Sequence, residues 1–275
     1  MRSSKIAIVR YIPLYAWLLF LVALFGFAIL ASLSTTREIF SNTLLSGGLK
    51  WSNYSSLFKN QEMARYFFNS TFYTVAACVG IVIIAAPAAY IVGRVNFFGK
   101  KLVNMMFISA MSIPGMLIAI PIFTLFTQLN LTGSVATLVL IYIATSVPYG
   151  VFLLSGFFSS IPRELEEAAA VDGCGTIRTF IKVIMPMAQP GIITLTIFNF
   201  MSIWNEYFYA LIFANNPKTY TLALALQFIV QGFTNTGNYA GIFAAAMIVF
   251  LPTFILYIFI SKKIVAGITV GAVKG

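Results

Sequence analysis

Four of the seven acidic residues in this 275-residue chain lie within the ten-residue stretch "ELEEAAAVDG", residues 164–173. Closely spaced carboxylates can act as a general acid and base when a pocket, a perturbed environment and further reactive groups surround them. Here they lie in a short connection between two strongly apolar stretches, with no other reactive side chain in it. We therefore expect these acids to serve structure or recognition rather than catalysis.

Other catalytic and metal chemistry is also not expected. Histidine is absent, and the two cysteines, Cys78 and Cys174, fall in an apolar stretch and in the polar connection. This set builds neither a histidine-based triad nor a metal site, and the two thiols are not expected to form a disulfide. The phosphate-binding pattern GxxxxGK[ST] is missing, so we expect no ATP site, no cofactor and no enzymatic activity on this chain.

The composition predicts an all-α polytopic membrane protein. Apolar residues make up 60% of the chain and charged residues 9%, which leaves too little polar surface for a water-soluble protein of this size. About 20 apolar residues cross the hydrocarbon layer as a helix. Six runs fit this length, and we predict a transmembrane helix in each: near residues 13–33, 70–92, 104–127, 135–158, 190–213 and 240–260. The first run is too long for the core of a signal peptide, so we expect it to be retained.

The net charge of +10 is distributed unevenly between the two sides of the membrane. If the connections alternate between sides, twelve basic residues fall on one side: Arg2, Lys5, Arg10, Arg94, Lys100, Lys101, Arg163, Arg178, Lys182, Lys262, Lys263 and Lys274. Only five fall on the other side. The positive-inside rule then predicts that both termini are cytoplasmic, and this distribution argues against nucleic acid as a partner.

The first part of the cytoplasmic connection, which runs from 159 to 189, is predicted to be a short helix between roughly Arg163 and Asp172. Ser160 is placed to cap it, early glutamates favour the positive end of the helix dipole, and Gly173 ends it. The small side chains of residues 168–170 let another surface approach closely. The alternative is a solvated helix whose acids only stabilise its N-terminus.

The second part of the connection, "TIRTFIKVIMP", is predicted to be an amphipathic helix that lies along the membrane surface. Pro186 and Pro190 are expected to end it. Prolines also interrupt the predicted spans at Pro87, Pro114, Pro121 and Pro148. We expect these spans to be kinked or broken, a feature found near transport pathways and also in ordinary helix packing.

Glu206 is the only residue within a predicted span that is charged at neutral pH in its ordinary state. A charge at the bilayer centre costs roughly 2.5 to 3.5 kcal/mol on insertion scales, so it is expected to face a partner or a wet cavity. One interpretation is that Glu206 lines a transport pathway together with Asn199, Trp204 and Asn205. The other is that Glu206 lies near the outer end of the span and pairs with another subunit.

Two connections on the outer side are too long for simple turns. The first, residues 35–70, is rich in aromatic residues and is expected to be packed or interfacial. The second, residues 214–240, is expected to contain a short amphipathic helix. Gln227, Gln231 and Asn235 would form its polar face.

Residues 166–190, "EEAAAVDGCGTIRTFIKVIMPMAQP", resemble the EAA loop of the membrane subunits of ABC importers. Cys174 and Met185 stand where alanine and leucine are usual, and both changes are mild in size. The resemblance implies that the helix docks in a cleft of an ATP-binding subunit. The residues expected to couple the two subunits are Glu164, Glu167, Ala168, Ala169, Asp172, Gly173 and Pro186.

Further motifs are similar to the shorter permease subunit of maltose-type carbohydrate importers. They are "WSNYSSLF", "NSTF", "IPGMLIAIPIF", "SIPRELEEAA", "WNEYFYAL" and "GITVGAVKG". The resemblance implies import of a di- or oligosaccharide across a bacterial or archaeal inner membrane. It implies as partners a second permease, two ATP-binding subunits that hold ATP and Mg, and an extracytoplasmic solute-binding protein that faces Gln227, Gln231 and Asn235.

The domain organisation that follows has an N-terminal part, residues 1–65, with the first span and the outside loop, and a permease core, residues 66–275, with the EAA loop at 159–189. Three alternatives stay open. The solute could be a glycerol-phosphate compound or another polar molecule. The chain could instead be a self-sufficient carrier or channel, or a membrane interaction subunit without transport.

Overall fold

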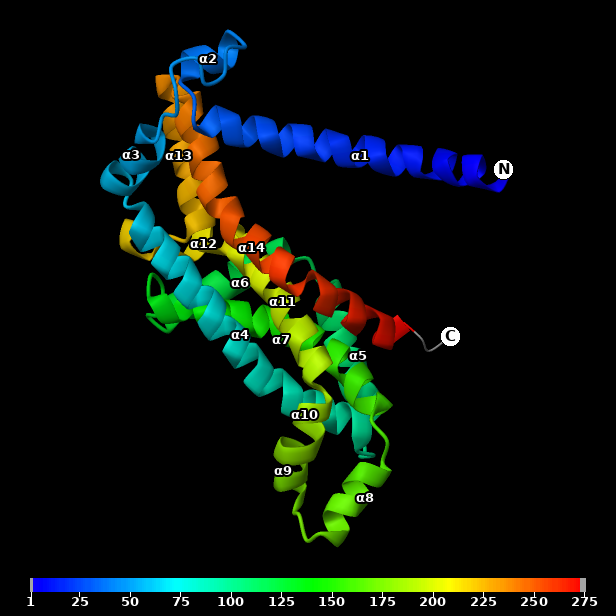
Figure 1. Cartoon of the computed structure of the whole chain (residues 1–275). Helices are drawn as coiled ribbons and strands as arrows, with labels where there is room; N and C mark the ends of the chain where they lie inside the picture. The colour runs from blue at the N-terminus through cyan, green and yellow to red at the C-terminus, as the bar shows by residue number, and fades with distance from the viewer. Residues whose placement is uncertain (1, 273–275) are drawn as a thin grey trace. The chain divides into compact units, whose positions relative to one another are not determined.

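The computed structural model describes residues 2–272, and the side chains of residues 11–59 and 61–259. Every regular element in this part of the chain is helical, which confirms the predicted all-α class (Figure 1). Lys274 and the end of the "GITVGAVKG" motif lie outside the described residues, as do the side chains of Arg2, Lys5, Arg10, Lys262 and Lys263.

The helices are α1 (Arg2–Ser32), α2 (Thr36–Phe40), α3 (Ser52–Asn60), α4 (Met63–Arg94), α5 (Lys100–Ser112), α6 (Gly115–Gln128), α7 (Val135–Ser160), α8 (Glu164–Val171), α9 (Thr176–Thr179), the π-helical η1 (Phe180–Ile184), α10 (Met185–Met187), α11 (Gln189–Trp204), α12 (Phe208–Phe213), the 3-10 turn η2 (Pro217–Thr219), α13 (Leu222–Thr236) and α14 (Tyr239–Ala272).

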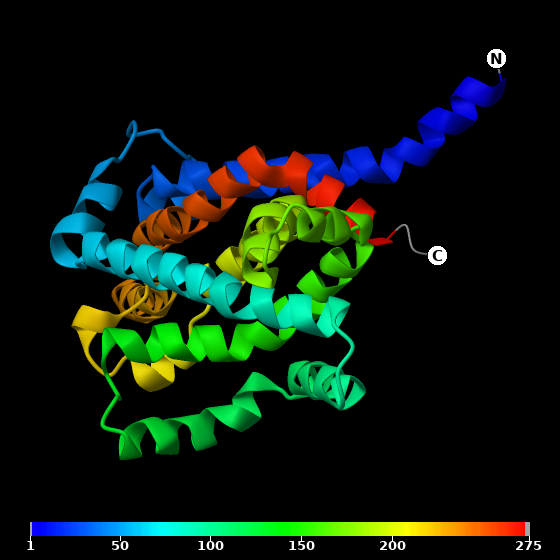
Figure 2. The same cartoon turned by 90° about the horizontal axis from the view of Figure 1, so that it is seen from below.

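Four helices are long and apolar enough to cross a membrane: Tyr11–Ser32, Met63–Arg94, Val135–Ser160 and Tyr239–Phe259. Two further helix pairs pass the same test together but are bent. The bend is 101° between α5 and α6, and 73° between Thr176–Met187, which comprises α9, η1 and α10, and α11. Figure 2 shows the turn between α5 and α6. If each bent pair is one span, the described residues contain up to six spans, the number predicted. The cytoplasmic placement of both termini stays a prediction.

The chain forms two compact units, one up to Ala64 together with Ala225–Pro252, the other Arg65–Leu224 together with the residues from Thr253. In the first unit, α1 packs on α14 through a stacked pair of rings, Phe25 and Phe250, whose centroids are 4.9 Å apart. The proposed division of the chain at residue 65 stays a prediction.

The connection after α1, which is predicted to lie on the outer side, is folded around Glu38, as expected for a packed segment. The buried Glu38 carboxylate accepts hydrogen bonds from the backbone amides of Thr35 and Gly47 and from the Ser46 hydroxyl. The amides of Thr35 and Gly47, followed by the hydroxyl, lower the pKa of Glu38 to about 2. The carboxylate therefore stays charged at neutral pH and holds the turn to α2 closed.

The core of the second unit lies where α4, α7 and α11 approach one another. Ile81 and Ala85 of α4, Leu154 of α7 and Leu195 of α11 are fully buried there. Gly150 of α7 permits the close approach, because a Cβ atom added to it would lie 2.9 Å from the Ala85 Cβ. Small residues at such crossings allow helices in membranes to pack tightly.

Proline positions alone did not predict where the helices break. Only Pro114 coincides with an interruption, because the preceding residue, Ile113, is extended and α6 starts after the proline. The helices α4, α6 and α7 continue through Pro87, Pro121 and Pro148, so these three prolines do not break a helix. A kink, the other expected outcome, stays a prediction at these positions. A helix in lipid tolerates a proline when neighbouring groups satisfy the freed carbonyl.

The segment after α8 also differs from its prediction. It is helical as expected, but Pro186 lies inside α10 and Pro190 lies in the first turn of α11, so neither ends a helix. The bend is at Ala188, between the two prolines. The π-helical η1 immediately precedes α10, and the amide of Met185 bonds the carbonyl of Phe180, five residues earlier.

The close crossing at Gly150 predicts opposite effects for one substitution at two positions of α7. Gly150→Ala is expected to destabilise the chain by about 1–3 kcal/mol, because the methyl group collides with Ala85. Gly156 has no atom within 4 Å of an added Cβ, so Gly156→Ala should be neutral or slightly stabilising. Thermal unfolding of the purified variants measures both effects. Equal destabilisation by the two changes would contradict the packing described here.

Candidate functional site

The helix predicted near residues 163–172 is α8, Glu164–Val171, within one residue at each end. Gly173 adopts a left-handed conformation with φ 77°, and the amide of Cys174 donates to the carbonyl of Ala169 at 2.9 Å. This is a common way to end a helix with glycine. The predicted stop at Gly173 is confirmed.

The predicted start of α8 is wrong in one respect. Ser160 does not cap α8, because it is the last residue of α7 and its hydroxyl donates to the carbonyl of Phe157. Arg163 stands at the N-cap position and provides no side-chain cap. The extended Ile161 separates the two helices and moves Ser160 out of reach.

A buried arginine joins α8 to the end of α4. Arg94 is the last residue of α4, and its guanidinium donates to the carboxylate of Glu166 with an Nη2–Oε2 distance of 2.6 Å. The same guanidinium donates to the carbonyls of Phe158, at 3.1 Å, and Ile161, at the end of α7. The last carbonyls of a helix have no partner within it, so one cation satisfies the end of α7 and pairs with α8.

Tyr90, one turn before Arg94, completes the contact by donating its hydroxyl to Oε1 of Glu166 at 2.8 Å. Burial opposes the ionisation of Glu166, but the hydrogen bonds from Arg94 and Tyr90 outweigh it and hold the pKa of that carboxyl below its ordinary value. The ion pair therefore contributes stability above the ordinary carboxyl pKa and loses that contribution as the pH falls through the lower folded value.

Aromatic rings hold the other arm of the loop. Phe180 of η1 lies 5.0 Å from the ring of Tyr90 and 6.1 Å from the ring of Phe158, measured between centroids. The two arms of the EAA loop, α8 and η1, are thus both fixed to α4. Figure 1 shows α8 and α9 together at one end of this unit.

The predicted coupling residues separate into outward and inward groups. Glu164, Glu167, Ala168, Asp172, Gly173 and Pro186 are exposed, whereas Ala169 is buried. Two apolar side chains that the sequence interpretation did not select, Val171 and Ile177, are 88% and 76% exposed. The solvent-exposed face of the loop therefore combines carboxylates with exposed apolar side chains.

The sequence interpretation also did not select Arg94, Tyr90 and Glu166 as a cluster. One signal was available, since Glu166 and Ala169 are three residues apart and share a helix face. The sequence interpretation placed Ala169 in the surface that docks on a partner, whereas this face of the helix packs against the rest of the chain. The partner Arg94 lies 72 residues away in sequence, and no local pattern indicates the pairing.

Glu206 has three hydrogen-bond donors from its own chain. Its carboxylate accepts from the amides of Tyr209, at 2.7 Å, and Ala210, at 3.3 Å, and from the hydroxyl of Tyr142, at 2.9 Å. The two amides belong to the first turns of α12, so Glu206 caps this helix after the interruption at Asn205. The predicted single span near 190–213 is therefore interrupted.

Of the other predicted pathway residues, only Asn205 is exposed. Asn199 is buried and donates to the carbonyl of Leu195, while Trp204 is buried and stacks on Phe200 at 5.6 Å. Asn205 donates to the carbonyl of Met201. The structure brings these residues to the end of α11, and their lining of a pathway stays a prediction.

The polar residues selected in the connection 214–240, which is predicted to lie on the outer side, are on α13, the helix expected there. Gln227, Gln231 and Asn235 are exposed and spaced by four residues, which places them on one face. Ile229 faces the interior. Among the residues that the structure describes, no group of three or more His, Cys, Asp or Glu side chains could hold a metal ion.

The contact between Arg94 and Glu166 predicts a coupling free energy that a double-mutant cycle can measure. Arg94→Ala should lower the free energy of unfolding by about 3 kcal/mol and Glu166→Ala by about 2 kcal/mol, because each leaves a charged partner partly buried. The double variant should lose less than the sum of the two. Glu164→Ala, on the exposed face of α8, is the matched control and should change stability by less than about 0.5 kcal/mol. Additive losses in chemical denaturation would show that the pair does not interact.

Glu206 predicts a second stability effect. Glu206→Ala should cost about 2–4 kcal/mol, since it removes the acceptor of three donors, and Tyr142→Phe about 1 kcal/mol. Asn205→Ala, at the exposed neighbour, is expected to stay within about 0.5 kcal/mol of the unmodified chain. Thermal unfolding tests this ranking. A Glu206→Ala variant of unchanged stability would contradict the capping role.

Comparison with known proteins gives consistent matches. The family model described as "Binding-protein-dependent transport system inner membrane component" matches residues 83–269, more than half of the chain. The melibiose/raffinose/stachyose import permease protein MelC of Bacillus subtilis (strain 168) is 30% identical over 280 residues. The match covers 100% of this chain and 100% of MelC. The diacetylchitobiose uptake system permease protein NgcG of Streptomyces coelicolor is 26% identical, with 99% of this chain and 90% of that protein covered.

A solved structure has a similar fold. It is the crystal structure of a bacterial ABC transporter involved in the import of the acidic polysaccharide alginate. One of its chains matches with a TM-score of 0.83 and 24% sequence identity, over 95% of this chain and 98% of that one. At this identity the likeness concerns the fold.

Proposed function

Because the chain belongs to the family of binding-protein-dependent transport system inner membrane components, we propose that it is the permease subunit of an ATP-driven sugar importer. The proposed solute is a di- or oligosaccharide. Support comes from two relatives covered over at least nine tenths of their length, which are named for diacetylchitobiose and for melibiose, raffinose and stachyose. An extracytoplasmic binding protein would deliver the sugar, and a second permease subunit would complete the pathway.

The observation that carries the proposal is the outward face of the EAA loop. Glu167 and Asp172 are exposed beside Val171 and Ile177, which are the most exposed large apolar side chains of this loop. Burial of such a side chain against a partner contributes about 1.5–3 kcal/mol. A separate ATP-binding subunit whose cleft offers basic and apolar groups fits this face.

The inward face of the same loop would pass a displacement on to the membrane helices. Arg94 and Tyr90 connect Glu166 to the end of α4, and Phe180 packs on both α4 and α7. A movement of α8 that left α4 behind would separate a buried ion pair, which is costly. ATP binding on the partner subunits would therefore bias the arrangement of α4 and α7, as a shift between existing populations.

The outer parts of the chain have proposed partners as well. The exposed polar face of α13, with Gln227, Gln231 and Asn235, would contact the sugar-binding protein. Four residues at the end of α11 were predicted to line a pathway or an interface: Asn199, Trp204, Asn205 and Glu206. Asn205 is the exposed one and is therefore the best placed of them to meet the sugar or the second permease. Glu206 would serve mainly to keep α12 in place, since its carboxylate already has three donors.

The coupling role is tested by reversing one charge on the outward face. Glu167→Lys is expected to reduce sugar uptake and sugar-stimulated ATP hydrolysis by at least about tenfold, because a charge-assisted contact becomes a repulsion. Lys59→Glu, an exposed reversal on the predicted outer side, is the control and should keep both activities. If the Glu167→Lys complex keeps its ATP-binding subunits and full uptake, the coupling role is wrong.

A second measurement separates this function from a self-sufficient carrier or channel. Proteoliposomes that contain this chain alone should show no sugar flux, whereas the complete complex should transport only with ATP. The sugar itself is identified by the compound that raises the melting temperature of the co-purified binding protein. A glycerol-phosphate compound that stabilises that protein, with no effect of oligosaccharides, would replace the proposed solute.

A further inference from the structure

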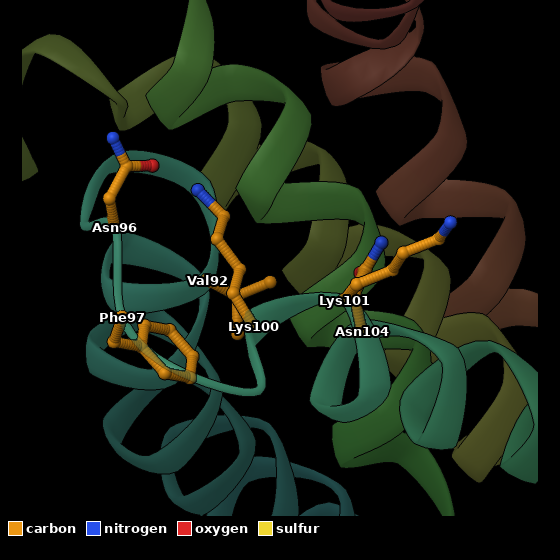
Figure 3. Close-up of a pocket in the computed structure, with 6 residues that line it drawn as sticks. All are labelled: Val92, Asn96, Phe97, Lys100, Lys101 and Asn104. Atoms are coloured by element: carbon orange, nitrogen blue, oxygen red, sulfur yellow. The ribbon is translucent and has the colours of Figure 1, made fainter.

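The connection between α4 and α5 forms an open basic hollow at the same end of the unit as the EAA loop. The hollow has a volume of about 420 Å³ and is lined by Val92, Asn96, Phe97, Lys100, Lys101 and Asn104 (Figure 3). The Arg94–Glu166 bond fixes this end of α4 to α8. If α8 is cytoplasmic, as the proposed function requires, the hollow faces the inner leaflet of the membrane.

The polar side chains of the hollow have no partners within the described part of the chain. The side chains of Asn96, Lys100, Lys101 and Asn104 make no hydrogen bond or ion pair with any residue whose side chain the structure describes. Arg94, the nearest basic residue in sequence, is fully engaged by Glu166 and the carbonyls of α7. The two lysines thus present unneutralised charge.

Their position on α5 makes this charge unfavourable unless an anion is present. Lys100 and Lys101 are the first two residues of α5, at the positive end of its dipole, and the first turn contains no acidic residue. Gly99 at the N-cap has φ 81° and provides no side chain to cap the amides. Two cations and uncapped amides at one helix start together attract a phosphate group.

Apolar side chains beside the hollow indicate which kind of phosphate compound fits. Phe98, in the turn before α5, is fully exposed, and Leu102, Met105 and Met106 of α5 are also exposed at 64%, 56% and 64%. Phenylalanine and leucine beside lysines are typical of segments that lie at the boundary between the headgroups and the acyl chains of a bilayer. A free phosphate ion would use the lysines but not these apolar groups.

We propose that the hollow formed by residues 92–104 binds the phosphate headgroup of an anionic phospholipid of the inner leaflet. Lys100 and Lys101 neutralise the phosphate, Asn96 and Asn104 donate to its oxygens, and Phe98 lies beside the glycerol and the start of the acyl chains. Basic pockets between membrane helices bind anionic headgroups through the same chemistry. The lipid would brace the α4–α5 turn, next to the helix end that holds the EAA loop.

The test uses the full-length chain in its complex and native mass spectrometry with phosphatidylglycerol or phosphatidylcholine of the same acyl chains. The unmodified complex should retain phosphatidylglycerol preferentially. The variant K100Q/K101Q should bind it about tenfold more weakly, because each lysine contributes to attraction of the headgroup. K59Q/K218Q, with the same change of net charge at exposed lysines on the predicted outer side, should bind as the unmodified complex does.

Two further arms distinguish the lipid from a free anion. Phe98→Ala should weaken the retention of phosphatidylglycerol, and inorganic phosphate at millimolar concentration should not displace the lipid. Equal retention of the two lipids, equal loss in both lysine variants, or displacement by inorganic phosphate would overturn the proposal. Sugar uptake in the same preparations is a separate readout, so a failure of lipid binding with intact uptake leaves the proposed function standing.

Discussion

The arrangement of the end of this permease that carries α8 depends on one buried cation, the guanidinium of Arg94. A charge removed from water is tolerated only when its partners compensate the lost hydration. Here the compensation comes from the carbonyls that end α7 and from the carboxylate of Glu166 on α8. Because no single element provides all the partners, α4, α7 and α8 have to keep one mutual position for the charge to be satisfied.

This constraint explains why neighbouring glutamates of one short helix serve different purposes. Residues 166 and 167 differ by about 100° around α8, so when Glu166 faces Arg94, Glu167 faces outward. The inward face fixes the helix to its own chain, and the outward face is available to a partner. In the proposed coupling role, a helix anchored in this way would transmit a displacement, whereas a loosely attached helix would absorb it.

The sequence predicted the elements that depend on local composition and missed those that depend on distant contacts. The six apolar runs could be predicted from their length and hydropathy. The end of α8 could be predicted from Gly173, because a glycine commonly adopts the left-handed conformation that ends a helix. The sequence could not show that the helix breaks at Pro114 but continues through Pro87. The outcome depends on whether neighbouring groups satisfy the backbone groups that the proline frees. The pairing of Arg94 with Glu166 likewise needs the tertiary structure.

The interruption between α11 and α12 is linked to the interruption between α5 and α6. At one, the carboxylate of Glu206 accepts from the first amides of α12, which would otherwise lack partners in an apolar surrounding. At the other, the carbonyl of Gly115, the first residue of α6, accepts from the hydroxyl of Tyr209, a residue that Glu206 holds by its amide. An added Cβ on Gly115 would lie 2.6 Å from that hydroxyl oxygen, so the contact also requires glycine. Tyr209 therefore links the two breaks, because its amide donates to Glu206 at one and its hydroxyl donates to Gly115 at the other.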